Sequence, residues 1–205
     1  MNFDSEQWNS VEQLDLFVLD QLLKKNITSE KILLDAGCGK GTHFIYFLKN
    51  EYAIDAIDQD GRQVQLVKEN LVNQSLDPNR IQCQSIEKMR FANRTFDYIF
   101  CMDVFHLAKD KSHLEQMWNE LWRVLKYGGM LFVKLYTTIG IEKYIQQKSE
   151  DRYQLENGQE LFLVDEMLLK KLAEQVNAVT VEPMKTVISN HTAITYWVVS
   201  KVMDI

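Results

Sequence analysis

A hydrophobic run that ends in an aspartate and three alternating glycines restricts the fold of this chain more than any other feature. The stretch spans residues 32–41 and reads ILLDAGCGKG. Glycine permits strained backbone turns and lets a ligand lie close to the chain. A parallel strand that turns sharply into a helix needs these properties, and the helix N-terminus then points its N–H groups at the ligand. The stretch therefore predicts a strand, a ligand-binding loop and a helix.

Strand-like and helix-like segments alternate after this loop. Short apolar runs and helical spacing of apolar residues distinguish the two kinds of segment. The residues at 126, 128 and 129, a lysine and two glycines, are expected to end the last helix of the alternating part. Such alternation predicts a parallel sheet with helices on both faces. The expected strands are 31–36, 52–58, 80–84, 96–103 and 130–136, and the expected helices are 42–50, 60–74 and 112–126.

Both ends of the chain depart from this alternation. Apolar residues at helical spacing predict a helix over residues 8–23. Asp165 is a suitable N-cap for a helix that runs to about Val176. Two later strand-like runs, 178–189 and 193–202, are separated by turn-forming residues. These runs predict an antiparallel hairpin at the edge of the sheet.

Composition limits the class of protein. The 205 residues suit a single domain over 1–205. The N-terminus is polar and no apolar run reaches the roughly 18–20 residues of a membrane span, so we expect a cytoplasmic protein without a membrane partner. The net charge is −6 without a basic stripe, which argues against binding to nucleic-acid phosphates. The three cysteines have no Cys/His cluster, so no metal site is predicted.

The glycine loop lacks the fingerprint of a pyrophosphate site. Position 42 is threonine, where the dinucleotide-binding pattern G-x-G-x-x-G has glycine. Asp35 precedes the loop and would place a carboxylate beside the ligand. A carboxylate repels phosphate and favours an amino group or another cation. The loop therefore predicts a positively charged small molecule as its ligand.

These residues resemble the motifs of class I S-adenosylmethionine-dependent methyltransferases. D-A-G-C-G-K-G is similar to the family's first motif, F-D at 96–97 opens the fourth strand as in many relatives, and E-L-W-R-V-L-K-Y-G-G at 120–129 resembles its R-V-L-K-P-G-G turn. Asp58 lies 21 residues after Gly37 and resembles the acid that holds both ribose hydroxyls. The resemblance spans residues 32–129 and implies S-adenosyl-L-methionine as cofactor. The cofactor-binding residues that it implies are Asp35, Gly37, Gly39, Gly41, Asp58, Gln59, Ser85, Ile86 and Met102.

Two residues depart from the family pattern, and the histidines leave a choice open. Ser85 replaces the usual acid beside adenine, which implies a weaker or water-mediated partner for the adenine amino group, and Tyr127 replaces the proline of the turn.

His106 follows the fourth strand, where relatives carry a residue near the transferable methyl group, so it is either the catalytic residue or a structural histidine. The other histidines, at 43, 113 and 191, have no supporting constellation and are expected to be structural.

The resemblance implies a Rossmann-like three-layer α/β sandwich, with a mostly parallel seven-stranded sheet and a C-terminal antiparallel hairpin. The implied activity is methyl transfer to an O, N or S nucleophile, with a small molecule as the favoured acceptor. The alternatives are a non-catalytic sensor or partner subunit that binds the cofactor, and a protein or RNA methyltransferase. Only Pro78 and Pro183 are present, so the Asn/Asp-Pro-Pro-aromatic motif of nucleic-acid amino-methylating enzymes is missing. We therefore expect no DNA partner and disfavour RNA; the sequence does not determine the oligomeric state.

Two segments are expected to cover the ligand site. Residues 1–25 are predicted to form a helical cap over the cofactor cleft, with the part around Trp8 on one side of the acceptor. Residues 137–159 contain glycines and tyrosines among many polar residues. That composition fits a partly helical, mobile substrate lid, and it equally fits a solvated excursion at the surface.

Overall fold

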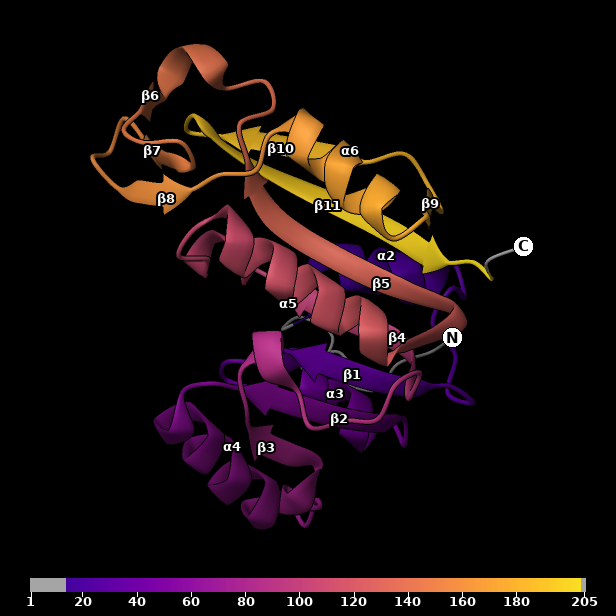
Figure 1. The fold of residues 1–205 in the computed structure, drawn as a ribbon. Helices are drawn as coiled ribbons and strands as arrows, with labels where there is room; N and C mark the ends of the chain where they lie inside the picture. Colours follow the sequence, from indigo (N-terminus) through magenta and orange to yellow (C-terminus); the bar gives the residue numbers. More distant parts are fainter. Residues whose placement is uncertain (1–13, 204–205) are drawn as a thin grey trace.

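The computed structural model describes residues 14–203, and its centre is one large twisted sheet (Figure 1). Seven strands follow in the order β10-β11-β5-β4-β1-β2-β3, and β9 pairs with β11 beside this path. The five strands from β3 to β5 pair in parallel, whereas β11 is antiparallel to β5, β9 and β10. This arrangement confirms the predicted mostly parallel sheet with a C-terminal antiparallel hairpin. The strands are β1 (Ile32–Ala36), β2 (Ala53–Asp58), β3 (Ile81–Cys83), β4 (Phe96–Met102), β5 (Leu125–Thr137), β9 (Ala178–Thr180), β10 (Lys185–Ser189) and β11 (Thr192–Lys201).

Helices cover both faces of this sheet. One apolar cluster joins α2, α3 and α4 to one face, and a second joins α5 and α6 to the other. Leu33 and Leu34 of β1 are both fully buried and belong to different clusters, because successive side chains of a strand point to opposite faces. The apolar run before the glycine loop is therefore continuous. The helices are α2 (Leu16–Leu23), α3 (Thr42–Lys49), α4 (Gly61–Asn73), α5 (Lys111–Val124) and α6 (Glu166–Gln175), with 3₁₀ turns η1 (Pro78–Arg80), η2 (Ile86–Lys88), η3 (Phe105–Leu107) and η4 (Glu142–Tyr144).

Aspartate side chains cap the N-termini of four of these helices, α2, α4, α5 and α6, and the cap of α5 is Asp110, which accepts from the His113 N–H. Asp60 accepts hydrogen bonds from the N–H groups of residues 62 and 63 at the start of α4. Asp165 accepts one from Leu168, which confirms the predicted N-cap of α6. Asp15 caps α2 at Phe17. The predicted helix over residues 8–23 thus begins at Leu16 in the described part of the chain, and residues 1–13 lie outside it.

The junction between α5 and β5 differs from the prediction. The helix ends at Val124 and β5 begins at the next residue, so the lysine and the two glycines expected to end the helix lie in the strand. Leu125 pairs with Phe96, and the Lys126 ammonium lies 2.8 Å from the Asp97 carboxylate. A Cβ atom on Gly129 would lie only 2.7 Å from the Asp97 carbonyl oxygen. Pairing with β4 therefore overrides the local helix-ending signal.

A turn connects β10 and β11, as predicted, and it consists of two residues; the predicted strand run 178–189 is divided into β9 and β10. Asn190 and His191 both have left-handed backbone conformations, with φ of 47° and 55°. Two left-handed residues match the right-handed twist of antiparallel strands. The hairpin places β11 between β5 and β10, so β11 is a buried interior strand and β10 forms the edge.

The segment between β5 and α6 forms a small antiparallel sheet of its own, drawn beyond the end of β5 in Figure 1. We call residues 138–164 the insert. Three short strands follow η4, so the predicted partly helical cover is mostly strand and turn. The insert has an apolar cluster of its own, which includes Ile141, Leu155 and Leu161. The strands of the insert are β6 (Gln146–Gln147), β7 (Arg152–Gln154) and β8 (Glu160–Phe162).

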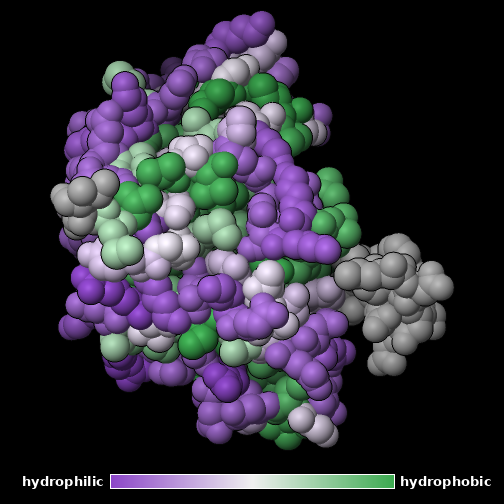
Figure 2. All heavy atoms as spheres, turned by 90° about the vertical axis from the view of Figure 1, so that its right-hand side faces the viewer, coloured by the Kyte–Doolittle hydropathy of each residue, from purple (hydrophilic) through white to green (hydrophobic). Residues whose placement is uncertain are grey.

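The face of the molecule at which β5 begins is mainly hydrophilic, with apolar side chains gathered in several patches (Figure 2). Among residues 14–203, no helix has both the length and the apolar character needed to cross a bilayer. The carboxyl ends of the parallel strands point to the opposite side of the sheet (Figure 1). Ligands of open α/β sheets bind at those ends.

One arginine of the R-V-L-K stretch anchors the segment between β3 and β4. The Arg123 guanidinium donates to the carbonyls of Met89, at 3.0 Å, and Phe91, at 2.9 Å. It also bonds both carboxylate oxygens of Glu120, at 2.8 and 2.9 Å. Residues 84–95, between β3 and β4, form only the 3₁₀ turn η2, and this side chain holds η2 and the residues after it against α5.

Arg123→Lys should therefore lower the free energy of unfolding by about 2 kcal/mol, because an ammonium cannot reproduce the forked hydrogen bonds to two carbonyls and a carboxylate. Urea unfolding measures this change, and amide hydrogen exchange should rise in residues 86–93. Arg94→Lys is the matched control, since exposed Arg94 stacks on the Tyr127 ring without anchoring a backbone segment. Equal losses for both variants would contradict the anchoring role.

Candidate functional site

The loop after β1 is fixed by backbone hydrogen bonds to β2. The N–H groups of Gly37 and Cys38 both donate to the Ile57 carbonyl, at 2.9 and 3.0 Å. The next glycine, Gly39, donates to a carboxylate oxygen of Asp58 at 2.8 Å. All three glycines of the loop have positive φ, of 82°, 52° and 76° in chain order. The loop is therefore a left-handed turn that only glycine adopts without strain.

The three glycines of the loop also differ in the atoms that lie near them. A Cβ atom on Gly37 would lie 2.5 Å from a methyl group of Val104, so β1 and the segment after β4 approach closely there. Gly41 is the N-cap of α3 and packs towards Val67 of α4. Gly39 faces open space: apart from its two chain neighbours, no other described residue has an atom within 4 Å of a Cβ built on it. The two outer glycines are needed for packing as well as for φ, while Gly39 leaves room beside the backbone.

Asp58 ends β2 and points its carboxylate at this turn. One oxygen accepts from Gly39 and the other accepts from the Asp60 N–H, each at 2.8 Å. Its side chain is half-buried at the mouth of the site. A carboxylate held in this way keeps free lone pairs on both oxygens, which suit the two hydroxyl groups of a ribose.

Asp35 lies beneath the turn and is 2% exposed. Burial raises the pKa of its carboxyl group to about 6, while the nearby His43 and the backbone N–H of Phe44 act in the opposite direction. Its Oδ2 atom has no hydrogen-bond partner among the described residues. Asp35 is thus a buried acid whose ionised form lacks full compensation, and a cation placed at the turn would supply it.

A cavity of about 190 Å³ opens at the carboxyl ends of the parallel strands, between the glycine turn, η2, η3 and α5. It brings five of the predicted cofactor residues together: Gly37, Gly39, Asp58, Gln59 and Ile86. The other predicted residues are not in its lining. Asp35 is under the turn, Gly41 caps α3, Ser85 precedes η2 without capping it through its side chain, Met102 is buried at the end of β4, and His106 lies in η3.

Seven further residues complete the lining, and four of them, Gln84, Glu87, Asp103 and His113, have polar or charged side chains that the sequence did not single out. Asp103 follows β4 with φ of 57°, which is unusual for a residue other than glycine. His113, expected to be structural, lines the cavity from the first turn of α5. An acid directly after the buried β4 run was the available sequence signal for Asp103. The additional lining residues are Gln84, Glu87, Asp103, Val104, Leu107, His113 and Met117.

Lys134 connects Asp103 to the N-cap of α2. Its ammonium lies 2.7 Å from Asp103 and 2.9 Å from Asp15, which caps α2. Burial works to lower the pKa of Lys134, but the hydrogen bonds to these two carboxylates raise it above its usual value. The second oxygen of Asp103, Oδ1, is buried and has no hydrogen-bond partner among residues 14–203. Two acids share one cation here, so the local charge is negative.

His106 lies in η3, with its ring 4.8 Å from the ring of Tyr136. Burial lowers its pKa below the usual value, although Asp103 acts in the opposite direction, so the imidazole is neutral at pH 7. Its Nδ1 atom is buried, and no described residue forms a hydrogen bond with it. A neutral imidazole with a free ring nitrogen is able to accept a proton.

Unpaired polar atoms concentrate at this end of the molecule. Buried side-chain atoms without a hydrogen-bond partner are rare in folded proteins and point to a missing ligand or water. Of five such atoms in residues 14–203, four belong to the cavity lining or its immediate surroundings, on Asp35, Asp103, His106 and His113. These unpaired atoms, together with Asp58, fit a nucleoside that carries a positively charged group. Asp58 would lie at the ribose, and Asp35 and Asp103 would lie near the positive charge.

Comparison with known proteins supports this assignment. Residues 34–133 match a protein family described as "Methyltransferase domain". The chain is 29% identical over 121 residues to a Coxiella burnetii protein named ubiquinone biosynthesis O-methyltransferase, an alignment that covers 55% of this chain and 50% of that protein. The chain spans about half the length of the curated relatives it matches.

Solved structures share the fold over most of the chain. An S-adenosylmethionine-dependent methyltransferase from Clostridium acetobutylicum superposes with a TM-score of 0.72 at 16% identity, covering 98% of this chain and 94% of that one. The 1,6-didemethyltoxoflavin-N1-methyltransferase of Burkholderia thailandensis, solved with its substrate and S-adenosylhomocysteine, gives 0.64 at 15% identity, covering 84% and 72%. At these identities the likeness shows the fold.

Asp58→Ala should weaken the binding of S-adenosylhomocysteine by about 1–3 kcal/mol, because ribose hydroxyls and the Gly39 N–H lose a charged acceptor. Isothermal titration calorimetry measures the change. Asp55→Ala on the same strand is the control, since its side chain pairs with Arg80 away from the cavity. If both variants bind as the unmodified protein does, Asp58 does not hold the ribose.

Asp35→Asn should stabilise the ligand-free protein at neutral pH. Between pH about 3.8 and about 6 the native state holds a proton that the unfolded chain has released, so the free energy of unfolding falls as pH rises through this window. The Asp35→Asn variant has no carboxyl group to ionise at this position, so its free energy of unfolding does not fall for this reason. We expect it to be more stable by about 2–3 kcal/mol at pH 7.5, with the difference vanishing near pH 4.

Urea unfolding at both pH values measures this difference. Asp97→Asn is the control, for which we expect a change in stability of the opposite sign. Burial acts to raise the pKa of Asp97, but hydrogen bonds from Lys126 and the Ile32 N–H outweigh it and lower this pKa. Its replacement should therefore destabilise the protein at neutral pH. A pH-independent effect of Asp35→Asn would show that burial of the ionised carboxylate is not the cause.

Proposed function

We propose that this chain, which belongs to the class I S-adenosylmethionine-dependent methyltransferase family, transfers a methyl group to an O, N or S atom of a small molecule. S-adenosyl-L-methionine is the cofactor, and when bound it supplies a methyl group activated by a positively charged sulfonium. The observation that carries the proposal is the left-handed glycine turn with Asp58 beside it and two unpaired buried carboxylate oxygens, on Asp35 and Asp103, close by.

The chain's own residues have mainly to bind and align the two reactants. Asp58 would hold the ribose, the backbone of the glycine turn would lie against the cofactor, and Asp35 and Asp103 would favour its positively charged end. Alignment of a donor and an acceptor in a dry site accounts for about 7–11 kcal/mol of a barrier in favourable cases. Little further chemistry is required of the protein unless the acceptor carries a proton at the working pH.

His106 is the group that we assign to proton removal. Its lowered pKa leaves it neutral, and its unpaired Nδ1 is free to accept a proton from an acceptor O–H or N–H group. Its position after β4, at the carboxyl ends of the strands, is the side on which ligands bind in open sheets. The contact with the Tyr136 ring restricts the imidazole without using a ring nitrogen.

A small acceptor fits the charge and the relatives better than a polymer does. A net charge of −6 disfavours a nucleic-acid backbone. The Coxiella and Burkholderia proteins have names that refer to methylation in ubiquinone biosynthesis and to a toxoflavin precursor, and both support a small acceptor here.

The insert is the element that we assign to covering the acceptor. Arg152 donates to the Ala108 carbonyl at 2.9 Å, and the Lys111 N–H donates to Asp151 at 3.1 Å. These bonds join the insert to the residues between η3, which carries His106, and α5. A cover attached at that point would exclude water from the methyl group.

A substrate panel tests the proposal. Purified protein with S-adenosylmethionine and a set of phenols, amines and thiols should form S-adenosylhomocysteine above the acceptor-free rate with at least one class. With that acceptor, His106→Gln should lower kcat about 100-fold or more while the affinity for S-adenosylhomocysteine stays unchanged. Cofactor binding without turnover on any acceptor would instead indicate a non-catalytic binding protein.

A further inference from the structure

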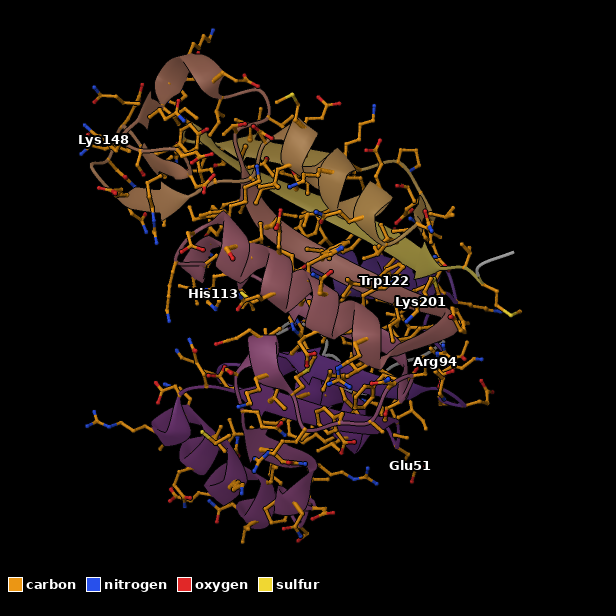
Figure 3. All side chains as sticks on the ribbon, in the orientation of Figure 1. Glu51, Arg94, His113, Trp122, Lys148 and Lys201 are labelled. Atoms are coloured by element: carbon orange, nitrogen blue, oxygen red, sulfur yellow. The ribbon has the colours of Figure 1, made fainter. Side chains whose placement is uncertain are left out.

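The end of the cavity formed by η2 and α5 carries one acid and one histidine. Glu87 projects from η2, and His113 projects from the first turn of α5, where Figure 3 labels it. Both side chains line the cavity and both are mostly shielded from solvent, at 28% and 17% exposure. The His113 Nε2 atom lies 3.5 Å from a carboxylate oxygen of Glu87. They form an adjacent pair of polar groups on the cavity wall.

The hydrogen bonds of His113 determine which ring nitrogen carries the proton. Its Nδ1 atom accepts the backbone N–H of Lys109 at 3.1 Å. A neutral ring with an acceptor at Nδ1 has its proton on Nε2. That Nε2 atom is buried and has no hydrogen-bond partner in the part of the chain that the structure describes, since the contact with Glu87 is too long or poorly aligned to count as one. His113 therefore offers an N–H donor that makes no hydrogen bond within residues 14–203, beside the Glu87 carboxylate.

The rest of this end of the cavity suits a flat heterocycle. Ile86, Leu107 and Met117 supply apolar lining from three different elements. Gln84 also lines the cavity, but its amide oxygen accepts the Arg90 N–H at 2.7 Å and its nitrogen donates to Gln82 at 2.9 Å. The amide of Gln84 is thus occupied. Glu87 and His113 are left to meet the polar edge of a base.

Ser85 occupies the position at which the family resemblance places an acid beside adenine. It does not supply a contact to the polar edge of the base. Ser85 is absent from the cavity lining, and its hydroxyl makes no capping bond at η2. The acid nearest to the cavity on this segment is instead two residues further on, at Glu87. Its segment is held in place by the anchor from Arg123 to Met89 and Phe91.

We propose that Glu87 and His113 together recognise the amino edge of the adenine base. The Glu87 carboxylate accepts a hydrogen bond from the exocyclic amino group, and the His113 Nε2–H donates to the neighbouring ring nitrogen. Adenine presents such an amino donor beside a ring-nitrogen acceptor, whereas a 6-oxo purine presents a carbonyl acceptor in place of the donor. The assignment rests on the cofactor and is independent of the acceptor and of catalysis.

The pair also gives the site a means of rejecting a deaminated base. A carbonyl oxygen facing the Glu87 carboxylate would bring two acceptors together with no proton between them. A buried polar group that loses its partner costs more than the hydrogen bond contributes when it is made. The chain should therefore distinguish the two bases by one functional group.

Calorimetry with S-adenosylhomocysteine and S-inosylhomocysteine tests this recognition directly. The unmodified protein should bind the adenosyl compound at least about tenfold more tightly. In Glu87→Gln the amide is able to donate to a 6-oxo group, so the preference should fall to about twofold or less. His113→Leu removes the donor and should weaken binding of S-adenosylhomocysteine about tenfold.

Glu115→Gln is the matched control, because this residue lies on α5 close to His113 but pairs with Lys171. It should keep the full preference, and unchanged thermal unfolding midpoints would show that the variants are folded. Equal binding of both compounds by the unmodified protein, or an unchanged preference in Glu87→Gln, would overturn the proposal while the methyltransferase assignment stands. If the unmodified protein bound neither compound, the base assignment and the cofactor would both be rejected.

Discussion

Three consecutive backbone N–H groups after β1 donate to the end of β2, and the geometry of the whole site depends on these bonds. Gly37 and Cys38 share the Ile57 carbonyl, and Gly39 donates to Asp58. The bonds form only if the chain turns through left-handed conformations, which glycine adopts without strain. The turn, the carboxyl end of β2 and the start of α3 are thereby fixed to one another before any side chain meets a ligand.

The charged groups around this turn are arranged for a cation and not for stability. Asp35 is buried with one oxygen unpaired, and Asp103 shares Lys134 with Asp15 while its other oxygen is unpaired. A buried carboxylate without full compensation destabilises the folded chain. A ligand that brings positive charge would offset this cost, so binding and stability are coupled at the same residues. The Glu87–His113 pair places a further carboxylate and a ring nitrogen on the cavity wall between η2 and α5.

Local patterns predicted the elements better than they predicted the junctions. Alternating apolar runs identified every parallel strand, Asp165 marked the start of α6, and the polar residues around Asn190 marked the hairpin turn. The prediction was wrong at the end of α5, because Gly129 resembles a helix terminator but is needed where β5 passes close to β4. It did not identify the strands of the insert, which are too short and too polar to show a period along the sequence.

The sequence by itself determined the glycine turn, the acid at the end of β2 and the order of strands and helices along the chain, because each depends on residues that are neighbours in sequence. Tertiary structure alone decided which polar groups share the cavity. Glu87 and His113 are 26 residues apart and come from different elements, so only packing of η2 against α5 makes them a pair. The same holds for Lys134 and Asp15, which lie on β5 and at the start of α2. Hydrogen bonding and burial act through space, so residues far apart along the chain acquire a common role only once the sheet has brought them together.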